Sequence, residues 1–142
     1  MTTSNDTTRA PATPTWLAAL RGNCMGAAVL LIVEFGLGMG VNLYVTLPAH
    51  KGFFSTVFGS ATLATHAIVA LILLGAAIGA LTRAIRAGRA VAFTAVGLAA
   101  ILVAAFAGAS FVGNQADGAS LGMALATAVA MFCYLGAIFS LR

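Results

Sequence analysis

Long apolar stretches, separated by short segments that carry nearly all of the charges, dominate the pattern of this sequence. Residues 52–82, 90–116 and 118–141 contain no Asp, Glu, Lys or Arg, and residues 22–50 contain a single one, Glu34. The hydrocarbon core of a bilayer is about 30 Å thick, and a helix that crosses it needs about 20 apolar residues. Each of the four stretches is long enough, so the pattern predicts four membrane-spanning helices.

The boundaries of these helices follow from the charges, prolines and short polar turns. We expect four spans, at about 23–47, 61–86, 89–112 and 119–141. Pro48 ends the first of them, because the residue before a proline avoids the helical conformation. Short connections make sequential helices antiparallel neighbours, so the expected fold is all-α, an integral membrane up-down four-helix bundle formed by residues 16–142.

The segments outside the spans differ in character. Residues 1–15 are small and polar and contain Pro11 and Pro14, which predicts a disordered cytoplasmic tail. Residues 49–60 contain Lys51 and three phenylalanines, so we expect an interfacial segment at this connection.

Small residues four positions apart recur within the spans and have two interpretations. They form Gly36-x-x-x-Gly40, Gly75-x-x-x-Gly79 and Ala104-x-x-x-Gly108. Inside lipid, such pairs let two helices approach closely. They indicate either packing within one bundle or a face on which a second copy packs.

Composition supports the membrane assignment and adds an orientation. The chain is 61% hydrophobic and 7% charged, against about 25% charged residues in soluble domains. Six of the seven basic residues lie at the chain ends or between the second and third spans, and only Lys51 lies on the other side. The positive-inside rule then places both termini in the cytoplasm. We also expect the chain to lie in the plasma membrane. The basic residues form no face with interleaved aromatics, which argues against a nucleic-acid partner.

Glu34 is the first candidate functional residue, because an ionisable side chain inside a membrane is costly. Glu34, Gly38 and Asn42 are spaced by four residues, so they share one helical face that we expect to point inward. No Lys or Arg lies at a matching depth, and the expected partners of the carboxyl group are hydroxyls such as those of Tyr134 and Thr127. Two interpretations remain open: a proton or ion site, or a protonated carboxyl group that only bonds a neighbouring helix.

His66 is the second candidate. It lies about five residues into the second span, which is about 7–8 Å along a helix axis. The residues expected at the same level are Asn42, Ser110 and Met123, with His50 above them on the connection. These positions predict a polar layer near the outer face, with Glu34 roughly 12 Å deeper.

Three segments carry a resemblance to a known family: MGVNLYVTLP at the end of the first span, His66 at the start of the second, and FAGASFVGNQADGASLGMAL between the third and fourth. This outline resembles one four-helix half of a haem A synthase, and it is similar to small bacterial four-span membrane proteins of unassigned function. In haem A synthases, histidines at the outer starts of the second and fourth helices face one haem. The resemblance implies that His66 ligates the iron of haem b. Met123 or His50 is then the second ligand, since the fourth span contains no histidine.

Three functions therefore remain as expectations. The first is a haem-binding or redox-associated protein with a polar pocket in the outer leaflet, formed by His66, Met123, His50 and Asn42. The second is a proton-coupled carrier of small molecules that uses Glu34. The third is an accessory or assembly subunit, whose partners besides the lipid bilayer are a second copy or a larger membrane complex. The sequence contains no motif of a known catalytic site.

Overall fold

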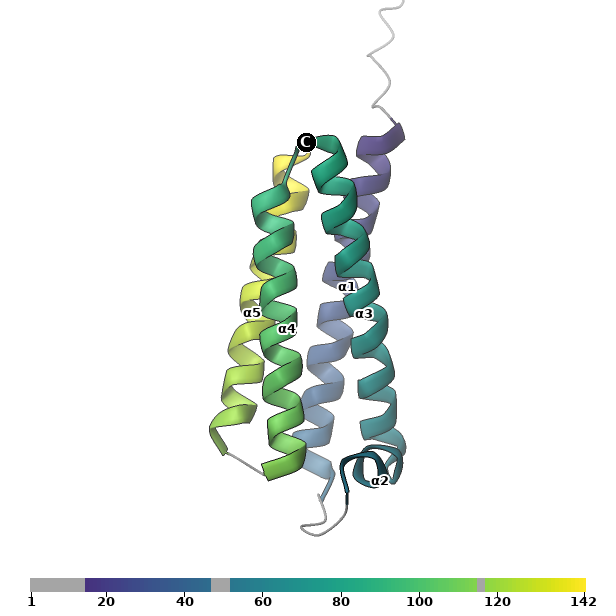
Figure 1. The fold of residues 1–142 in the computed structure, drawn as a ribbon, viewed down its shortest axis with the longest axis vertical. Helices are drawn as coiled ribbons and strands as arrows, with labels where there is room; N and C mark the ends of the chain where they lie inside the picture. The colour runs from purple at the N-terminus through teal and green to yellow at the C-terminus, as the bar shows by residue number, and fades with distance from the viewer. Residues whose placement is uncertain (1–14, 47–51, 115–116) are drawn as a thin grey trace, which may run out of the picture.

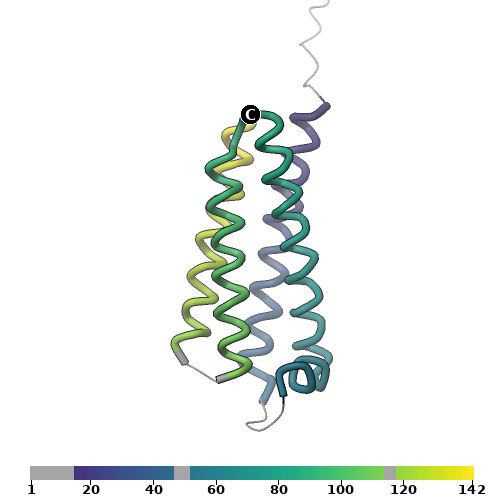
Figure 2. The backbone as a smooth tube through the Cα atoms, in the orientation of Figure 1, coloured from purple at the N-terminus to yellow at the C-terminus, as the bar shows by residue number. Residues whose placement is uncertain are grey.

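The computed structural model describes residues 15–46, 52–114 and 117–142, and this part of the chain is almost entirely helical and contains no strand. The helices are α1 (Thr15–Tyr44), α2 (Phe53–Phe58), α3 (Ala61–Ala87), α4 (Val91–Asn114) and α5 (Asp117–Ser140). The four long helices lie side by side and alternate in direction (Figure 1), which confirms the predicted all-α bundle. We call the end where α1 begins and α5 ends the terminal end, and the opposite end the α2 end (Figure 2).

Each long helix is long and apolar enough to cross a membrane. Large apolar side chains also cover the outside of the bundle: Phe106 and Phe132 are each 76% exposed, and Leu71 is 69% exposed. A soluble monomer rarely exposes contiguous apolar surface on this scale. The four helices therefore fit a multi-pass membrane protein whose outer surface contacts lipid.

The first long helix begins earlier than expected, at Thr15 and not near Asn23. The sequence places the boundary at the charge of Arg21, but a charge limits only the part of a helix inside the hydrocarbon, not the helix itself. The extra turns are anchored because Leu20 is fully buried while Arg21 is exposed. The predicted disordered tail, apart from Thr15, lies outside the described residues.

The connection between the first two spans contains a short helix, α2, which the sequence predicts only as an interfacial segment. The hydroxyls of Ser55 and Thr56 donate hydrogen bonds to the Gly52 carbonyl, 2.8 and 3.2 Å away, and stabilise its first turn. Val57 is buried in a small apolar cluster with Val41 and Leu63, which attaches α2 to the bundle. Pro48, His50 and Lys51 lie outside the described residues.

The two halves of the bundle are packed differently. In the half nearer the terminal end, a large apolar core contains buried side chains from all four long helices. Its largest fully buried residue, Tyr134, packs on Gly97, where a Cβ atom would lie 2.9 Å from the tyrosine Cε2. In the half nearer the α2 end, the buried apolar cluster is much smaller. Across the bundle, α4 packs most extensively on α5, and α1 on α3.

The glycines of the small-residue pairs divide between the two interpretations. Gly79 faces Arg83 and Asn23, and Gly108 faces Met123, so these two residues take part in packing within the bundle. A Cβ atom at Gly36, Gly40 or Gly75 would meet nothing within 4 Å. The internal-packing interpretation therefore does not account for these three glycines.

The turn between α3 and α4 has an unusual backbone. Gly88, with φ of 63°, caps α3, and its N–H donates to the carbonyls of Ala84 and Ile85. Ala90 also has a positive φ of 57°, although it carries a side chain. The left-handed conformation is unfavourable for residues with a Cβ atom. Ala90 is nonetheless held there, because it packs against the core and accepts a hydrogen bond from Thr94.

Candidate functional site

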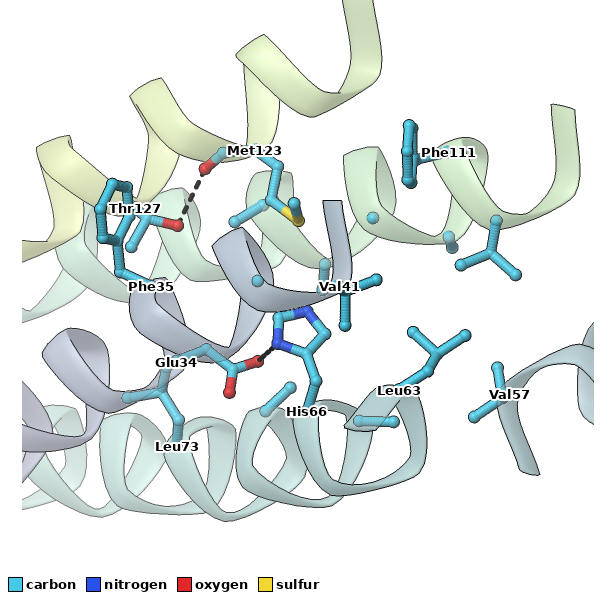
Figure 3. A pocket seen from close by; sticks show the side chains of 18 of the residues that line it. Glu34, Phe35, Val41, Val57, Leu63, His66, Leu73, Phe111, Met123 and Thr127 are labelled. Atoms are coloured by element: carbon cyan, nitrogen blue, oxygen red, sulfur yellow. Dashed lines mark hydrogen bonds and ion pairs between the residues drawn. The ribbon is translucent and has the colours of Figure 1, made fainter. Parts of the chain in front are cut away.

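A cavity of about 410 Å³ lies inside the bundle in the half nearer the α2 end. All five described helices contribute to its lining, which is mostly Ala, Leu, Val and Phe (Figure 3). The polar side chains on the lining are few: Glu34, Asn42, His66, Ser120 and Thr127. An apolar cavity of this volume with a small number of polar groups has the character of a small-molecule site.

Glu34 of α1 and His66 of α3 meet in this cavity. Glu34 Oε1 lies 3.1 Å from His66 Nδ1, and the Glu34 residue is only 8% exposed. The contact does not have the geometry of a hydrogen bond, and it is an ion pair when the imidazole is protonated and the carboxyl group is ionised. Figure 3 shows the two side chains pointing toward each other from neighbouring helices.

This contact corrects the sequence expectation in two respects. Glu34 does not lie a further 12 Å below His66, and its partner is His66 and not a hydroxyl. Thr127 donates its hydroxyl hydrogen to the Met123 carbonyl of its own helix, 2.8 Å away, and Tyr134 lies in the terminal half. The expected depths assumed that the helices end at one level. In the structure α1 and α3 are offset along their axes, which brings His66 level with Glu34 and Gly38.

Gly38 explains how the imidazole ring fits. A Cβ atom at Gly38 would lie 3.3 Å from His66 Cε1 and 3.9 Å from Met123 Cε. Gly108 on α4 serves Met123 in the same way, since a Cβ there would lie 3.3 Å from the sulfur. The structure therefore brings His66 and Met123 together, as the sequence predicts. The spacing of Gly38 from Glu34 was the signal for its role, but nothing in the sequence indicates Gly108 as a contact of Met123.

Asn42 lies at a different level from His66. It accepts a hydrogen bond from the Ser120 hydroxyl of α5, 3.2 Å away, nearer the α2 end. Ser110 is exposed on α4 and does not join the polar layer, and His50 lies outside the described residues. The predicted single layer is therefore wrong. The structure has two polar positions, the Glu34–His66 pair and the Asn42–Ser120 pair.

The Glu34–His66 pair leaves two polar atoms free. Glu34 Oε2 is buried and has no hydrogen-bond partner in the described part of the chain. His66 Nε2, on the other side of the ring, also contacts no donor or acceptor among the described residues. Most buried polar atoms in proteins are hydrogen-bonded, so unsatisfied atoms in a cavity indicate a place where a ligand or water bonds.

The donor set fits one axial ligand of a haem better than it fits the whole group. The other ring nitrogen of a metal-bound histidine usually has a carboxylate, a backbone carbonyl or a water as its partner, and His66 Nδ1 has the Glu34 carboxyl group beside it. Met123 supplies a thioether near the ring. Carboxylate groups of a haem would find no Lys or Arg beside the cavity in the described ranges, because the arginines there lie at the terminal end. Those ranges also contain no cluster of three or more His, Cys, Asp or Glu side chains.

Comparisons of this chain with protein-family models, with curated proteins and with solved structures found no match.

Proposed function

We propose that this chain is a membrane-embedded protein that binds a small lipid-soluble molecule in the cavity at the α2 end and exchanges a proton with it through Glu34 and His66. The observation that carries the proposal is the buried Glu34–His66 contact of 3.1 Å in the lining of an otherwise apolar cavity. This proposal keeps the pocket of the sequence analysis around His66 and Met123 and adds Glu34 to its binding residues, but it assigns the pocket no redox reaction.

The chemistry of the pair suits proton exchange. A carboxylate with an imidazolium, and a carboxyl group with a neutral imidazole, hold the same number of protons and have no net charge. Either form is therefore compatible with an apolar site, where an isolated charge is costly. Removal of one proton leaves a net negative charge, and addition of one leaves a net positive charge. A bound molecule that carries the opposite charge, or that exchanges a proton with the pair, removes this net charge from the apolar site.

Filling the cavity tests the binding part of the proposal. We expect Ala104→Phe on α4 to reduce binding of naphthalene at least tenfold, because Ala104 lines the cavity and the larger ring occupies it. Naphthalene bound by the full chain in lipid nanodiscs is measured by equilibrium dialysis against protein-free discs of the same lipid. Ala99→Phe is the matched control, since Ala99 lies on α4 but is exposed outside the cavity. Equal binding by both variants and the wild type contradicts the proposal.

Infrared difference spectroscopy on the same nanodiscs tests the proton-exchange part with 2-naphthol as the ligand, because naphthalene has no exchangeable proton. Addition of 2-naphthol should raise or lower the intensity of the carboxyl C=O stretching band of the wild type, which reports gain or loss of the Glu34 proton. The change should be missing in Glu34→Gln, which keeps the shape of the side chain but cannot ionise. A band that does not respond to ligand shows binding without proton exchange.

Haem binding is a second candidate, favoured by the orientation of His66. With Nδ1 beside Glu34, Nε2 is the free donor, and the bound iron would supply electron-transfer chemistry. We expect titration of the detergent-solubilised chain with haemin to produce a sharp Soret band that His66→Ala abolishes. Met123→Leu should shift the band if the thioether is the second ligand. His50→Ala should shift it instead if the second ligand is His50. A wild-type spectrum identical to that of haemin in detergent alone excludes this candidate.

The orientation and the partners belong to the same proposal. The α2 end would face the outside of the plasma membrane, since the described arginines lie at the terminal end. Transport of the ligand across the membrane would make the chain the proton-coupled carrier of the sequence analysis. A homodimer or a larger complex is supported by Gly36 and Gly40, whose faces are open on the outside of α1.

A further inference from the structure

The cavity opens sideways, between α3 and α4, toward the surface that faces lipid. Several residues both line it and are exposed: Leu71 on α3, Ala105 and Ala109 on α4, and Phe54 and Phe58 on α2. The short helix α2 contacts both α3 and α4, so it lies over the end of this opening.

Side-chain size distinguishes this opening from the other side of the bundle. Between α3 and α4 the lining includes four alanines, Ala67, Ala70, Ala105 and Ala109, next to the larger Leu71 and Leu74. On the side of α1 and α5 the exposed lining residues Phe35 and Met39 are large, and the Ser120–Asn42 hydrogen bond joins the two helices. The α3–α4 side therefore offers the wider route from the bilayer into the cavity.

The polar atoms at the inner end of this route define what they can bind. Glu34 Oε2 is buried and unpartnered, and no hydrogen bond joins His66 Nε2 to another described residue. Both side chains line the cavity. A hydroxyl group that reaches Oε2 can donate to the carboxylate form of Glu34. It can equally accept from the carboxyl form, so one hydroxyl group suits either protonation state of Glu34. A permanent cation would bond only Oε2 and would leave a net positive charge, unless the pair lost a proton.

The rest of the lining selects the body of the ligand. Five phenylalanines line the cavity, Phe35, Phe53, Phe54, Phe58 and Phe111. Aromatic rings pack favourably edge-to-face or offset against one another. A flat aromatic molecule therefore suits the lining, and the Glu34–His66 pair suits a hydroxyl group on its edge.

We infer that the cavity takes a neutral, lipid-soluble molecule with a ring-bound hydroxyl group, such as a phenol or quinol, which enters from the bilayer between α3 and α4 and bonds the free oxygen of Glu34. This inference rests on the proposed function and specifies its ligand class and route. Binding alone is inferred, with no oxidation or reduction of the ligand.

Three ring compounds test the ligand class on the wild-type chain: 2-naphthol, 2-methoxynaphthalene, which accepts but cannot donate a hydrogen bond, and naphthalene. Equilibrium dialysis of full-chain nanodiscs against protein-free discs corrects for solubility in lipid. We expect 2-naphthol to bind about tenfold or more tightly than either other compound, as for a hydrogen bond to a charged group. Equal affinities for the three compounds overturn the ligand class, whether or not any variant folds. In Glu34→Leu the preference for 2-naphthol should disappear while naphthalene binding stays.

Tryptophans at the opening test the route. Ala105→Trp and Ala109→Trp should slow both association and dissociation of 2-naphthol severalfold, measured by stopped-flow fluorescence, with little change in Kd. Ala99→Trp is the control on the same helix, exposed but outside the cavity lining. Rates that are equal in all three variants and the wild type overturn the lateral route.

The experiments distinguish a failure of the proposed function from a failure of the inferred ligand class. If Ala104→Phe blocks naphthalene but the wild type shows no hydroxyl preference, the cavity binds ligands and the inferred class is wrong. If 2-naphthol is preferred but the Glu34 carboxyl band does not respond to it, the ligand class stands and proton exchange is wrong.

Discussion

Glu34 and His66 reach each other across two helices because the residue beside them, Gly38, has no side chain. The imidazole ring lies where a Cβ atom at Gly38 would be 3.3 Å from Cε1. An ionisable residue in a membrane usually faces the protein interior and has a partner there. The structure satisfies this rule with a histidine, and it leaves one oxygen of Glu34 free for a ligand.

The pair should also contribute to stability, which a double-mutant cycle measures. Glu34→Leu or His66→Leu alone leaves a polar partner behind in an apolar cavity, whereas the double variant leaves none. We expect the losses of unfolding free energy in the two single variants to add up to about 1 kcal/mol or more above the loss in the double variant. The measurement is the free energy of unfolding by SDS in mixed micelles.

A cycle of Glu34→Leu with Thr94→Val serves as the control. Thr94 is buried in α4, and its hydroxyl bonds carbonyls of its own turn. Its effect should add to that of Glu34→Leu. A Glu34–His66 coupling no larger than this control means that the pair contributes nothing to folding.

At the residue scale, the sequence was informative about which side chains matter and uninformative about their partners. Glu34 and His66 stand out because charged and polar residues are rare in the spans. The depth of each was estimated by counting from a helix end, and α1 and α3 do not end at the same level. An offset of one or two turns depends on packing between helices, which no local pattern encodes.

At the scale of the elements, the turn between α3 and α4 shows how a short connection is forced to fit. Gly88 takes the left-handed conformation without strain because it has no Cβ atom. Ala90 takes a similar conformation with one, and α4 begins at the next residue, Val91. The backbone conformation at Ala90 is therefore set by the two helices and not by the preference of the residue.

Replacement of Ala90 relieves this strain. We expect Ala90→Gly to raise stability by up to about 1 kcal/mol, because glycine adopts positive φ freely, less the packing lost with the methyl group. Ala90→Val should lower stability, since a β-branched residue fits this conformation less well. Thermal unfolding of the three proteins in detergent checks the order. A glycine variant less stable than the wild type would show that the contacts of the methyl group outweigh the strain.

Some helix boundaries follow from nearby residues in the sequence, and others depend on contacts with distant residues. The start of α3 agrees with the expected span because a serine precedes it: Ser60 Oγ accepts from the Leu63 N–H at 3.4 Å. The start of α1 was placed too late at a charge, and α2 was not predicted as a helix. Six residues are too few for a helical pattern to be evident, and α2 is held by the contacts of Val57 with the bundle.

At the scale of the whole molecule, hydropathy alone predicts the bundle, because each span must satisfy its backbone hydrogen bonds internally in lipid. It does not predict that the half nearer the terminal end is tightly packed while the half nearer the α2 end contains a cavity. The tightly packed half contains small residues that bring helices close, such as Ala77, Ala80 and Ala84 on α3. The half with the cavity also contains alanines, but they line the opening between α3 and α4. Alanines are therefore buried in one half and line a cavity in the other. The distance between the helices at each level decides which of these occurs.

In the proposed function, the depth of the Glu34–His66 pair makes the exchanged proton sensitive to the membrane potential. From Glu34 to the α2 end of α1 at Tyr44 the helix rises about 15 Å, half of a hydrocarbon core about 30 Å thick. Moving one elementary charge across the whole membrane is worth about 2.3 kcal/mol per 100 mV, so a proton that travels half of the way gains or loses about 1 kcal/mol. An energised membrane would therefore change the proton occupancy of the site severalfold at constant pH, and ligand binding would respond to voltage as well as to concentration.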